Sequence, residues 1–226
     1  MGCKFLRPVF FKKNICMMKF FLIVVCVFTS IVSMAQKGDS SIYGKEPKLQ
    51  IALKINNKNY KVYENEELKI NEPVTNPAIT VKISDYKTFE NAAYSFDYPK
   101  NMSYEYSREE ASNTWTLNGN SLNIIVFELE AKVPIDLLIN EMIDKFGKEN
   151  CKTENAAYSF GNKKCAGRKL NISLAGQKLV LYFYELVSAK NNSGFIAFQD
   201  SLTDTGESSE EYRKVLSLVE STFKFK

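Results

Sequence analysis

Residues 49–83 of this 226-residue chain carry a repeated strand pattern. Apolar residues alternate with mostly polar ones, as in half-buried strands, in short runs at 49–55, 60–63, 68–70 and 79–83. Asparagine-rich and proline-rich stretches separate these runs and are typical of turns and loops. Residues 48–84 are therefore predicted to form a small β element of three or four strands. The polar segment 36–47 before it is predicted to be a linker.

The longer remainder, 88–226, mixes further strands with helices. Short apolar runs predict strands at 94–99, 102–106, 114–117, 122–129, 168–174, 178–187 and 194–198. The run 178–187 is apolar on both faces, which predicts a central strand with Leu181 and Tyr182 both buried.

Two segments of this remainder have the pattern of amphipathic helices. The first begins at Pro134 and ends at Gly147, with apolar residues on one face. Ser208 and Glu211 are predicted to form a capping box that starts the second helix. The expected fold class is α+β, with two main helices on an antiparallel sheet, preceded by the small N-terminal β element.

Residues 1–35 have the pattern of a secretory signal peptide. Lys19 precedes an apolar run, and the small residues Ser33 and Ala35 mark a cleavage site before Gln36. The basic region is unusually long, which makes Met17 or Met18 the expected start. The apolar stretch is shorter than the roughly 20 residues of a spanning helix, so cleavage is favoured over membrane anchoring. The mature protein is therefore predicted to be periplasmic or extracellular, with no stable membrane span.

Charge changes the picture once the leader is removed. The leader contains five of the 30 basic residues and none of the 26 acidic ones, so the mature chain has a net charge of −1. Nucleic-acid binding needs a cationic surface that neutralises phosphates. We therefore expect no nucleic-acid partner.

The chain contains no histidine, which removes several kinds of site. A Ser-His-Asp triad, a Cys-His pair, a histidine zinc site and an imidazole general base are all excluded. Carboxylate, lysine and tyrosine chemistry stays open. No catalytic residue, cofactor-binding residue or metal ligand is predicted, and no cofactor is expected.

Cys151 and Cys165 are the two cysteines that follow the leader. An even pair in an oxidising compartment predicts a Cys151–Cys165 disulfide. A two-residue turn at 161–162 would place Cys165 opposite Tyr158 and Cys151 further along the strand, so the bridge requires a wider loop. The alternative is two separate thiols, at least one of them buried.

Several of these segments resemble the PsbP-like family. Residues 94–100 (YSFDYPK) are similar to the opening strand of that family, and the order of strands and helices up to 221–225 is similar too. The resemblance covers about residues 88–226 and implies an α/β/α sandwich with a non-enzymatic role. One departure is Met102, where the family usually has an aromatic residue.

Two hypotheses for function follow. The first is a secreted or periplasmic non-enzymatic binding or assembly module of the cell envelope, whose partner is an unknown envelope protein or a small ligand. In this hypothesis the element at 48–84 is a second contact surface. The alternative is a secreted hydrolase with a carboxylate-based or Lys/Tyr-based site. One pocket with two carboxylates about 5–9 Å apart favours the hydrolase. An exposed apolar patch on a flat face favours binding. The aromatic residues Tyr98, Tyr104, Tyr106 and Trp115 fit a ligand groove or, more commonly, the core of the sheet.

Overall fold

The computed structural model describes residues 44–186 and 191–226. The signal peptide predicted at 1–35 and most of the linker predicted at 36–47 lie outside the described residues, so both stay predictions. Within the described ranges, no helix has the length and apolar character that crossing a bilayer requires.

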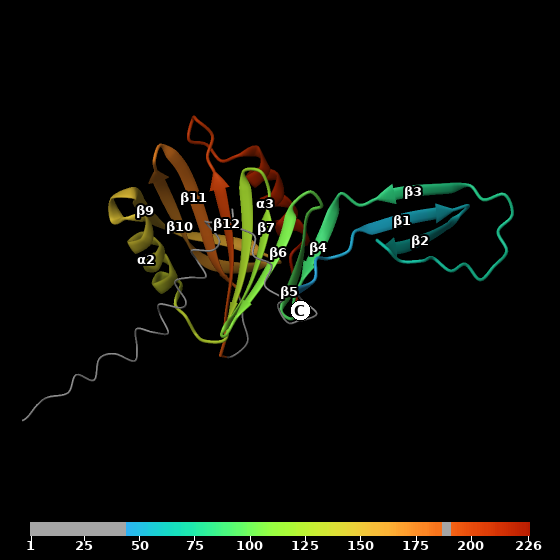
Figure 1. Ribbon diagram of the computed structural model, residues 1–226, viewed down its shortest axis with the longest axis horizontal. Coiled ribbons are helices and arrows are strands. Elements are labelled where there is room, and N and C mark those ends of the chain that lie inside the picture. Colours follow the sequence, from blue (N-terminus) through green and yellow to red (C-terminus); the bar gives the residue numbers. More distant parts are fainter. Residues whose placement is uncertain (1–43, 187–190) are drawn as a thin grey trace, which may run out of the picture.

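Seven antiparallel strands form the main sheet, in the spatial order β6-β7-β8-β12-β11-β10-β9 (Figure 1). Their bounds are β6 Ser103–Glu109, β7 Ser112–Asn118, β8 Leu122–Leu129, β9 Cys151–Phe160, β10 Lys163–Leu174, β11 Gln177–Leu186 and β12 Ser193–Ser201. Ala175 and Gly176 both have positive φ, which gives the tight turn predicted between β10 and β11. The predicted central strand is β11, which lies between β12 and β10.

A second, smaller sheet has the order β13-β5-β4. Its strands are β4 Tyr86–Glu90, β5 Tyr94–Pro99 and β13 Lys224–Phe225. The pairing of β13 with β5 joins the last residues of the chain to the strand in the YSFDYPK segment. This long-range pairing has no counterpart in the local sequence pattern.

The third sheet, with the order β2-β1-β3, comprises β1 Gln50–Ile55, β2 Lys58–Tyr63 and β3 Ile79–Ile83. Three of the four strand runs expected at 48–84 are therefore present, whereas Leu68 and Ile70 lie in a connecting segment. The sheet projects away from the rest of the molecule (Figure 1), and we call it the arm.

Helix α2 (Ile135–Phe146) begins after Pro134 and ends at Gly147, as predicted. A short 3₁₀ helix, η2 (Lys148–Asn150), follows it. Helix α3 (Glu210–Thr222) has Ser209 as its N-cap, because the Ser209 side chain accepts a hydrogen bond from the Tyr212 N–H. The capping box predicted at Ser208 and Glu211 is wrong.

The Glu211 carboxylate binds the β7–β8 turn rather than its own helix. It accepts hydrogen bonds from the backbone N–H groups of Asn120, Ser121 and Leu122. Charge-assisted hydrogen bonds of this kind are stronger than neutral ones. Glu211 therefore fastens the start of α3 to the main sheet.

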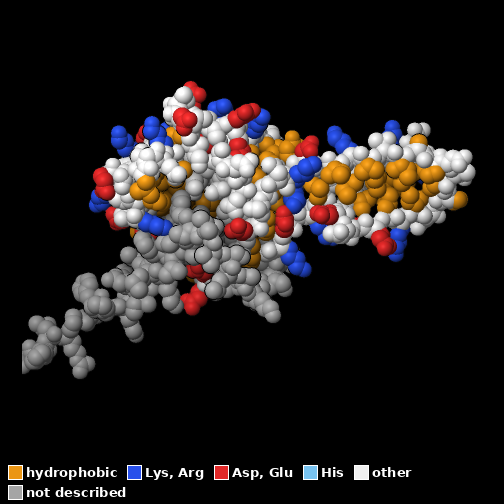
Figure 2. Space-filling model, turned by 45° about the horizontal axis from the view of Figure 1, so that its top comes forward, with side chains coloured by type: hydrophobic (Ala, Val, Ile, Leu, Met, Phe, Trp, Pro, Cys, Tyr) orange, Lys and Arg blue, Asp and Glu red, His pale blue; other side chains and the backbone are white. Residues whose placement is uncertain are grey.

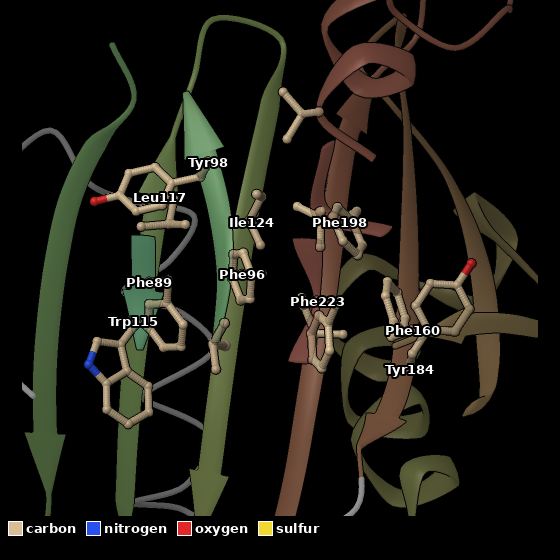
Figure 3. Packing of buried hydrophobic residues seen from close by; sticks show 14 of the residues in the cluster. Phe89, Phe96, Tyr98, Trp115, Leu117, Ile124, Phe160, Tyr184, Phe198 and Phe223 are labelled. Atoms are coloured by element: carbon tan, nitrogen blue, oxygen red, sulfur yellow. The ribbon is translucent and has the colours of Figure 1, made fainter. Parts of the chain in front are cut away.

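The faces of the main sheet are covered by two apolar clusters. Ile135, Leu138, Ile139 and Met142 of α2 pack with residues of β8, β10, β11 and β12 on one face. On the other face, α3 and the second sheet together cover a core rich in aromatic rings (Figure 3). Phe223 lies at the centre of the second cluster, with ring centroids 5.7 Å from Phe96 and 5.2 Å from Phe160.

The expected fold class, an α+β domain built as an α/β/α sandwich, is wrong. Strands make up 52% of the described residues and helices only 16%, so the fold is dominated by β structure. The physical reason lies on the α3 face, where Phe89 of β4 and Phe96 of β5 enter the core beside the helix. A sheet thus occupies much of the place that a helical layer would have in a sandwich.

The predicted disulfide is not formed, because both cysteines are free thiols. The β9–β10 ladder places Cys165 opposite Tyr158, as the two-residue turn required, and Cys151 opposite Ile172. The two positions are seven residues apart along the ladder, which is about 23 Å at the usual rise of a strand. A disulfide needs Cα atoms within about 7 Å.

Candidate functional site

The arm exposes three large aliphatic side chains on its outer strand. Ile79, Val81 and Ile83 of β3 are 59%, 56% and 50% exposed. Successive side chains of a strand point to opposite faces, so these alternate positions share one face. Figure 2 shows the result as a continuous apolar patch along the arm.

The cross-strand register extends this apolar face over most of the arm, up to Lys58 of β2, which pairs with Ile55 and lies on the same side. On β1, Ile51, Leu53 and Ile55 are the pairing partners of Ile83, Val81 and Ile79. On β2, Val62 pairs with Ile51, and Tyr60 pairs with Leu53. Directly paired residues point to the same side of a sheet. We call this set of eight side chains on the three strands the apolar face.

The opposite face of the arm is polar and basic. It carries Lys54 on β1, Lys61 on β2 and Lys82 on β3, with Thr80 directly opposite Lys54. All four of these residues are exposed. The arm is therefore a sheet with one face suited to water and one face suited to an apolar neighbour, which is the usual character of one layer of a β-sandwich.

Part of the apolar face is already covered, because Val62 of β2 and Ile55 of β1 are buried. The connecting segment 64–78 runs back along β2 before it reaches β3 (Figure 1), and its Leu68 and Ile70 are half-buried. Lys58 of β2 is hydrogen-bonded to Glu72 of this segment. The hydrogen bond and charge of Glu72 raise the pKa of Lys58, and those of Lys58 lower the pKa of Glu72. The segment is thus attached to β2, while β3 stays exposed.

Strand β3 also forms an open edge of the arm. It is the last strand in the order β2-β1-β3. The Ser84 N–H donates to the Gln50 carbonyl, which places the even-numbered amides of this strand on the β1 side. The backbone groups of Ile79, Val81 and Ile83 consequently point away from the arm. An exposed apolar edge strand of this kind is a favoured place for contact with another chain.

A shallow hollow of about 670 Å³ lies beside the root of the arm, between β4, β5 and α3. Its lining includes Tyr86, Pro99 and Leu218, together with the polar side chains Glu210, Arg213 and Lys214. Lys214 is hydrogen-bonded to Glu210 and lowers the pKa of that carboxyl group. The lining contains one carboxylate, so it lacks the carboxylate pair that a glycosidase mechanism needs.

The half-buried carboxylate of Glu128 has a structural explanation. Burial raises the pKa of Glu128, and the Asn91 side-chain amide donates to it at 2.7 Å. The Asn91 carbonyl oxygen accepts from the backbone N–H groups of Ala93 and Tyr94. The pair therefore fastens the turn before β5 to β8. Among the described residues, no group of three or more acidic or cysteine side chains is arranged to hold a metal ion.

The aromatic residues that fitted either a ligand groove or the core belong to the core. Tyr98 and Trp115 are almost completely buried, and Tyr104 and Tyr106 pack against the same cluster. No residue of the apolar face was predicted as a site, although the alternation at 79–83 was recognised. The pattern indicated a half-buried strand, and only the structure shows that the described residues leave β3 uncovered.

Comparison with known proteins identifies no family for this chain. No family model and no curated protein sequence matches the chain, so the resemblance to PsbP-like proteins stays a prediction. A solved structure from Bacteroides thetaiotaomicron VPI-5482 aligns with a TM-score of 0.36 and 14% identity, over 59% of this chain and 45% of that one. LpqN of Mycobacterium tuberculosis, described as involved in cell envelope biogenesis, aligns with a TM-score of 0.36 and 9% identity, over 59% and 83%. Similarity at this level establishes neither a shared fold nor a shared function.

Proposed function

We propose that this chain is a secreted or periplasmic, non-enzymatic binding or assembly module of the cell envelope, and that it contacts its partner through the apolar face of the arm. One observation carries the proposal. Ile79, Val81 and Ile83 are each at least half exposed, side by side, on the open edge of a projecting sheet. The secreted or periplasmic location in this proposal rests on the predicted signal peptide.

Exposed apolar residues are common on proteins when they are scattered, but a contiguous patch is not. Burial of apolar surface is favourable by roughly 25 cal/mol per Å². A neighbour that covers Ile79, Val81 and Ile83 therefore gains more than one that covers the lysine-rich opposite face. The projecting arm also lets a partner approach without contacting the main sheet (Figure 1).

The alternative of a secreted hydrolase has no observation in its favour among the described residues. Its carboxylate mechanism requires two acidic side chains in one pocket. The hollow beside α3 has only Glu210, which is exposed and bound to Lys214. Its Lys/Tyr version requires a desolvated amine or phenol in that pocket, whereas Lys214 and Tyr86 are both exposed.

A photo-crosslinking amino acid placed at position 81 tests the proposal in living host cells. We expect irradiation to give a covalent adduct of higher mass from position 81, because Val81 lies in the centre of the exposed apolar strand. Position 80 is the matched control, since Thr80 is also exposed on the same strand but faces the other side. Immunoblotting and mass spectrometry of the adduct give the readout.

An adduct from position 81 and none from position 80 supports the proposed contact surface. If position 81 gives no adduct of any kind, or if both positions give the same adducts, the apolar face is not the contact surface.

A further inference from the structure

We infer that two copies of this chain form a dimer by antiparallel pairing of β9, an open edge strand of the main sheet. The main sheets of the two copies then become one continuous sheet. β9 lies outside the arm, so this contact goes beyond the proposed function and does not depend on it. The free backbone groups, the charges and the position of β9 support pairing between identical copies.

The outer backbone groups of β9 are available for pairing. The two-residue turn at 161–162 makes Phe160 and Lys163 a hydrogen-bonded pair, which directs the backbone groups of the even-numbered β9 residues to β10. The N–H and carbonyl groups that point outward are then those of the odd-numbered residues, Thr153, Asn155, Ala157 and Ser159. Within residues 44–186 and 191–226, no backbone hydrogen bond to another element engages these groups.

The shape of β9 also suits edge pairing. With ten residues, it is longer than β6, the seven-residue strand at the other edge of the sheet. Its register with β10 runs without a bulge over the whole strand, and the strand contains no proline. Prolines and bulges are devices with which proteins prevent a second strand from adding to an edge. The side chains at 152–155, 157 and 159 are exposed, so a second strand can approach.

The two charged side chains of β9 fit a second copy of the same strand. An antiparallel ladder centred on Asn155 places Lys152 of one copy opposite Tyr158 of the other. The Tyr158 hydroxyl donates to the Glu220 carboxylate at 2.6 Å, so the Lys152 ammonium meets an acidic neighbour across the contact. Glu154 lies opposite a small neutral residue in this register. No like charges are therefore directly opposed, which favours a second copy over a strand of unrelated sequence.

The length of the ladder sets the strength of the expected dimer. Pairing over residues 151–159 gives a ladder about 30 Å long. It supplies about eight main-chain hydrogen bonds, because the Cys151 N–H already donates to the Lys148 carbonyl. Standard protein interfaces have about ten direct hydrogen bonds, but they bury more apolar area than the narrow edge of a sheet does. We expect a dimer that dissociates on dilution, with a dissociation constant of about 1–100 µM.

The position of β9 gives the dimer a consequence for binding. β9 and the arm lie at opposite ends of the molecule (Figure 1). Pairing at β9 therefore leaves both arms free and directs them away from the contact. A dimer of this kind presents two copies of the apolar face, and two linked binding surfaces hold a multivalent partner more tightly than one.

Sedimentation velocity of the processed protein, purified from its host, tests the dimer. Over about 1–500 µM the weight-average mass is expected to rise from that of one chain toward that of two. The test variant is Asn155→Pro, which removes the central outward N–H of β9 but none of the N–H groups that bond to β10. The matched control is Asn155→Ala, which keeps this N–H. Circular dichroism checks that both variants fold.

Asn155→Pro is expected to dimerise at least about tenfold more weakly than the natural sequence, because both copies lose a donor at the centre of the ladder. Asn155→Ala is expected to dimerise like the natural sequence.

Engineered cysteines test the register without a proline. Directly opposed residues of a hydrogen-bonded pair have Cα atoms about 5.5 Å apart, which is within the range of a disulfide. In a Cys151→Ser background, mild oxidation of Asn155→Cys is expected to give a disulfide-linked dimer. Ala157→Cys is the control on the same strand and face, because its counterpart in the second copy lies about 13 Å further along the ladder. Mass spectrometry of the linked peptides gives the readout.

A natural protein that stays monomeric throughout the concentration range overturns the dimer. Dimerisation of Asn155→Pro at the natural strength rejects pairing through β9, as does equal linkage of Asn155→Cys and Ala157→Cys. If Asn155→Pro unfolds, the two cysteine variants decide alone. None of these results bears on the adduct expected at position 81, so failure of the dimer is distinct from failure of the proposed function.

Discussion

The variant Phe223→Ala is expected to lose about 3–5 kcal/mol of unfolding free energy. Phe223 is 4% exposed, and its ring is stacked on those of Tyr94 and Phe96. It also contacts Phe160 of β9, so one side chain joins α3, the second sheet and the main sheet (Figure 3). Removing the ring leaves a cavity between three elements that cannot all move together to fill it.

Urea titration followed by circular dichroism gives the free energy of unfolding of this variant. The control is Phe225→Ala, two residues later on β13, because Phe225 is only half-buried. Its expected loss is smaller, about 1–2 kcal/mol. Equal losses in the two variants would show that Phe223 is not the centre of this core.

The variant Leu181→Ala is expected to lose about 2–5 kcal/mol. Leu181 is 1% exposed and belongs to the cluster under α2, as the apolar pattern of its strand predicted. Its neighbour Tyr182 was also predicted to be buried, but it is half-buried and stacks on Tyr212 with ring centroids 5.1 Å apart. Leu181 therefore carries more of the packing than Tyr182 does.

The same denaturant titration measures this loss, with Glu185→Ala as a control at an exposed position of β11. The control is expected to change stability by less than about 0.5 kcal/mol. A loss below about 1 kcal/mol for Leu181→Ala would contradict the assignment of β11 as a strand buried on both faces.

Local sequence patterns predicted much of the secondary structure. Helix α2 lies between Pro134 and Gly147 as expected, because proline and glycine act on the backbone within a few residues. The strand predicted at 122–129 matches β8. The alternating runs of the arm were likewise recognised, since side-chain alternation is a local property of a strand.

What the sequence did not predict depends on contacts between distant residues. Glu211 was assigned to a capping box from its spacing, whereas the folded chain brings it to the backbone N–H groups of the β7–β8 turn. The pairing of β5 with β13 joins residues more than a hundred positions apart. Neither of these has a local periodicity.

The element at 48–84 was expected to be a contact surface, but its exposed residues were not identified, for a related reason. Alternation at 79–83 shows that Ile79, Val81 and Ile83 share a face, but it does not show whether anything covers that face. An apolar face on a strand is usually taken to be buried. The structure is needed to show that Ile79, Val81 and Ile83 stay exposed while other residues of the apolar face, such as Ile55 and Val62, are buried.

Occlusion of Val81 in the native envelope tests the central claim most directly. The measurement is the rate at which a membrane-impermeant maleimide labels Val81→Cys in intact host cells with a permeabilised outer layer, relative to the dilute purified protein. Thr80→Cys, on the opposite face of β3, corrects for access of the reagent, and peptide mass spectrometry separates both sites from Cys151 and Cys165. The account predicts that Val81→Cys is labelled several times more slowly in cells than in dilute solution, while Thr80→Cys is labelled equally in both. Equal rates for Val81→Cys in cells and in solution would contradict it.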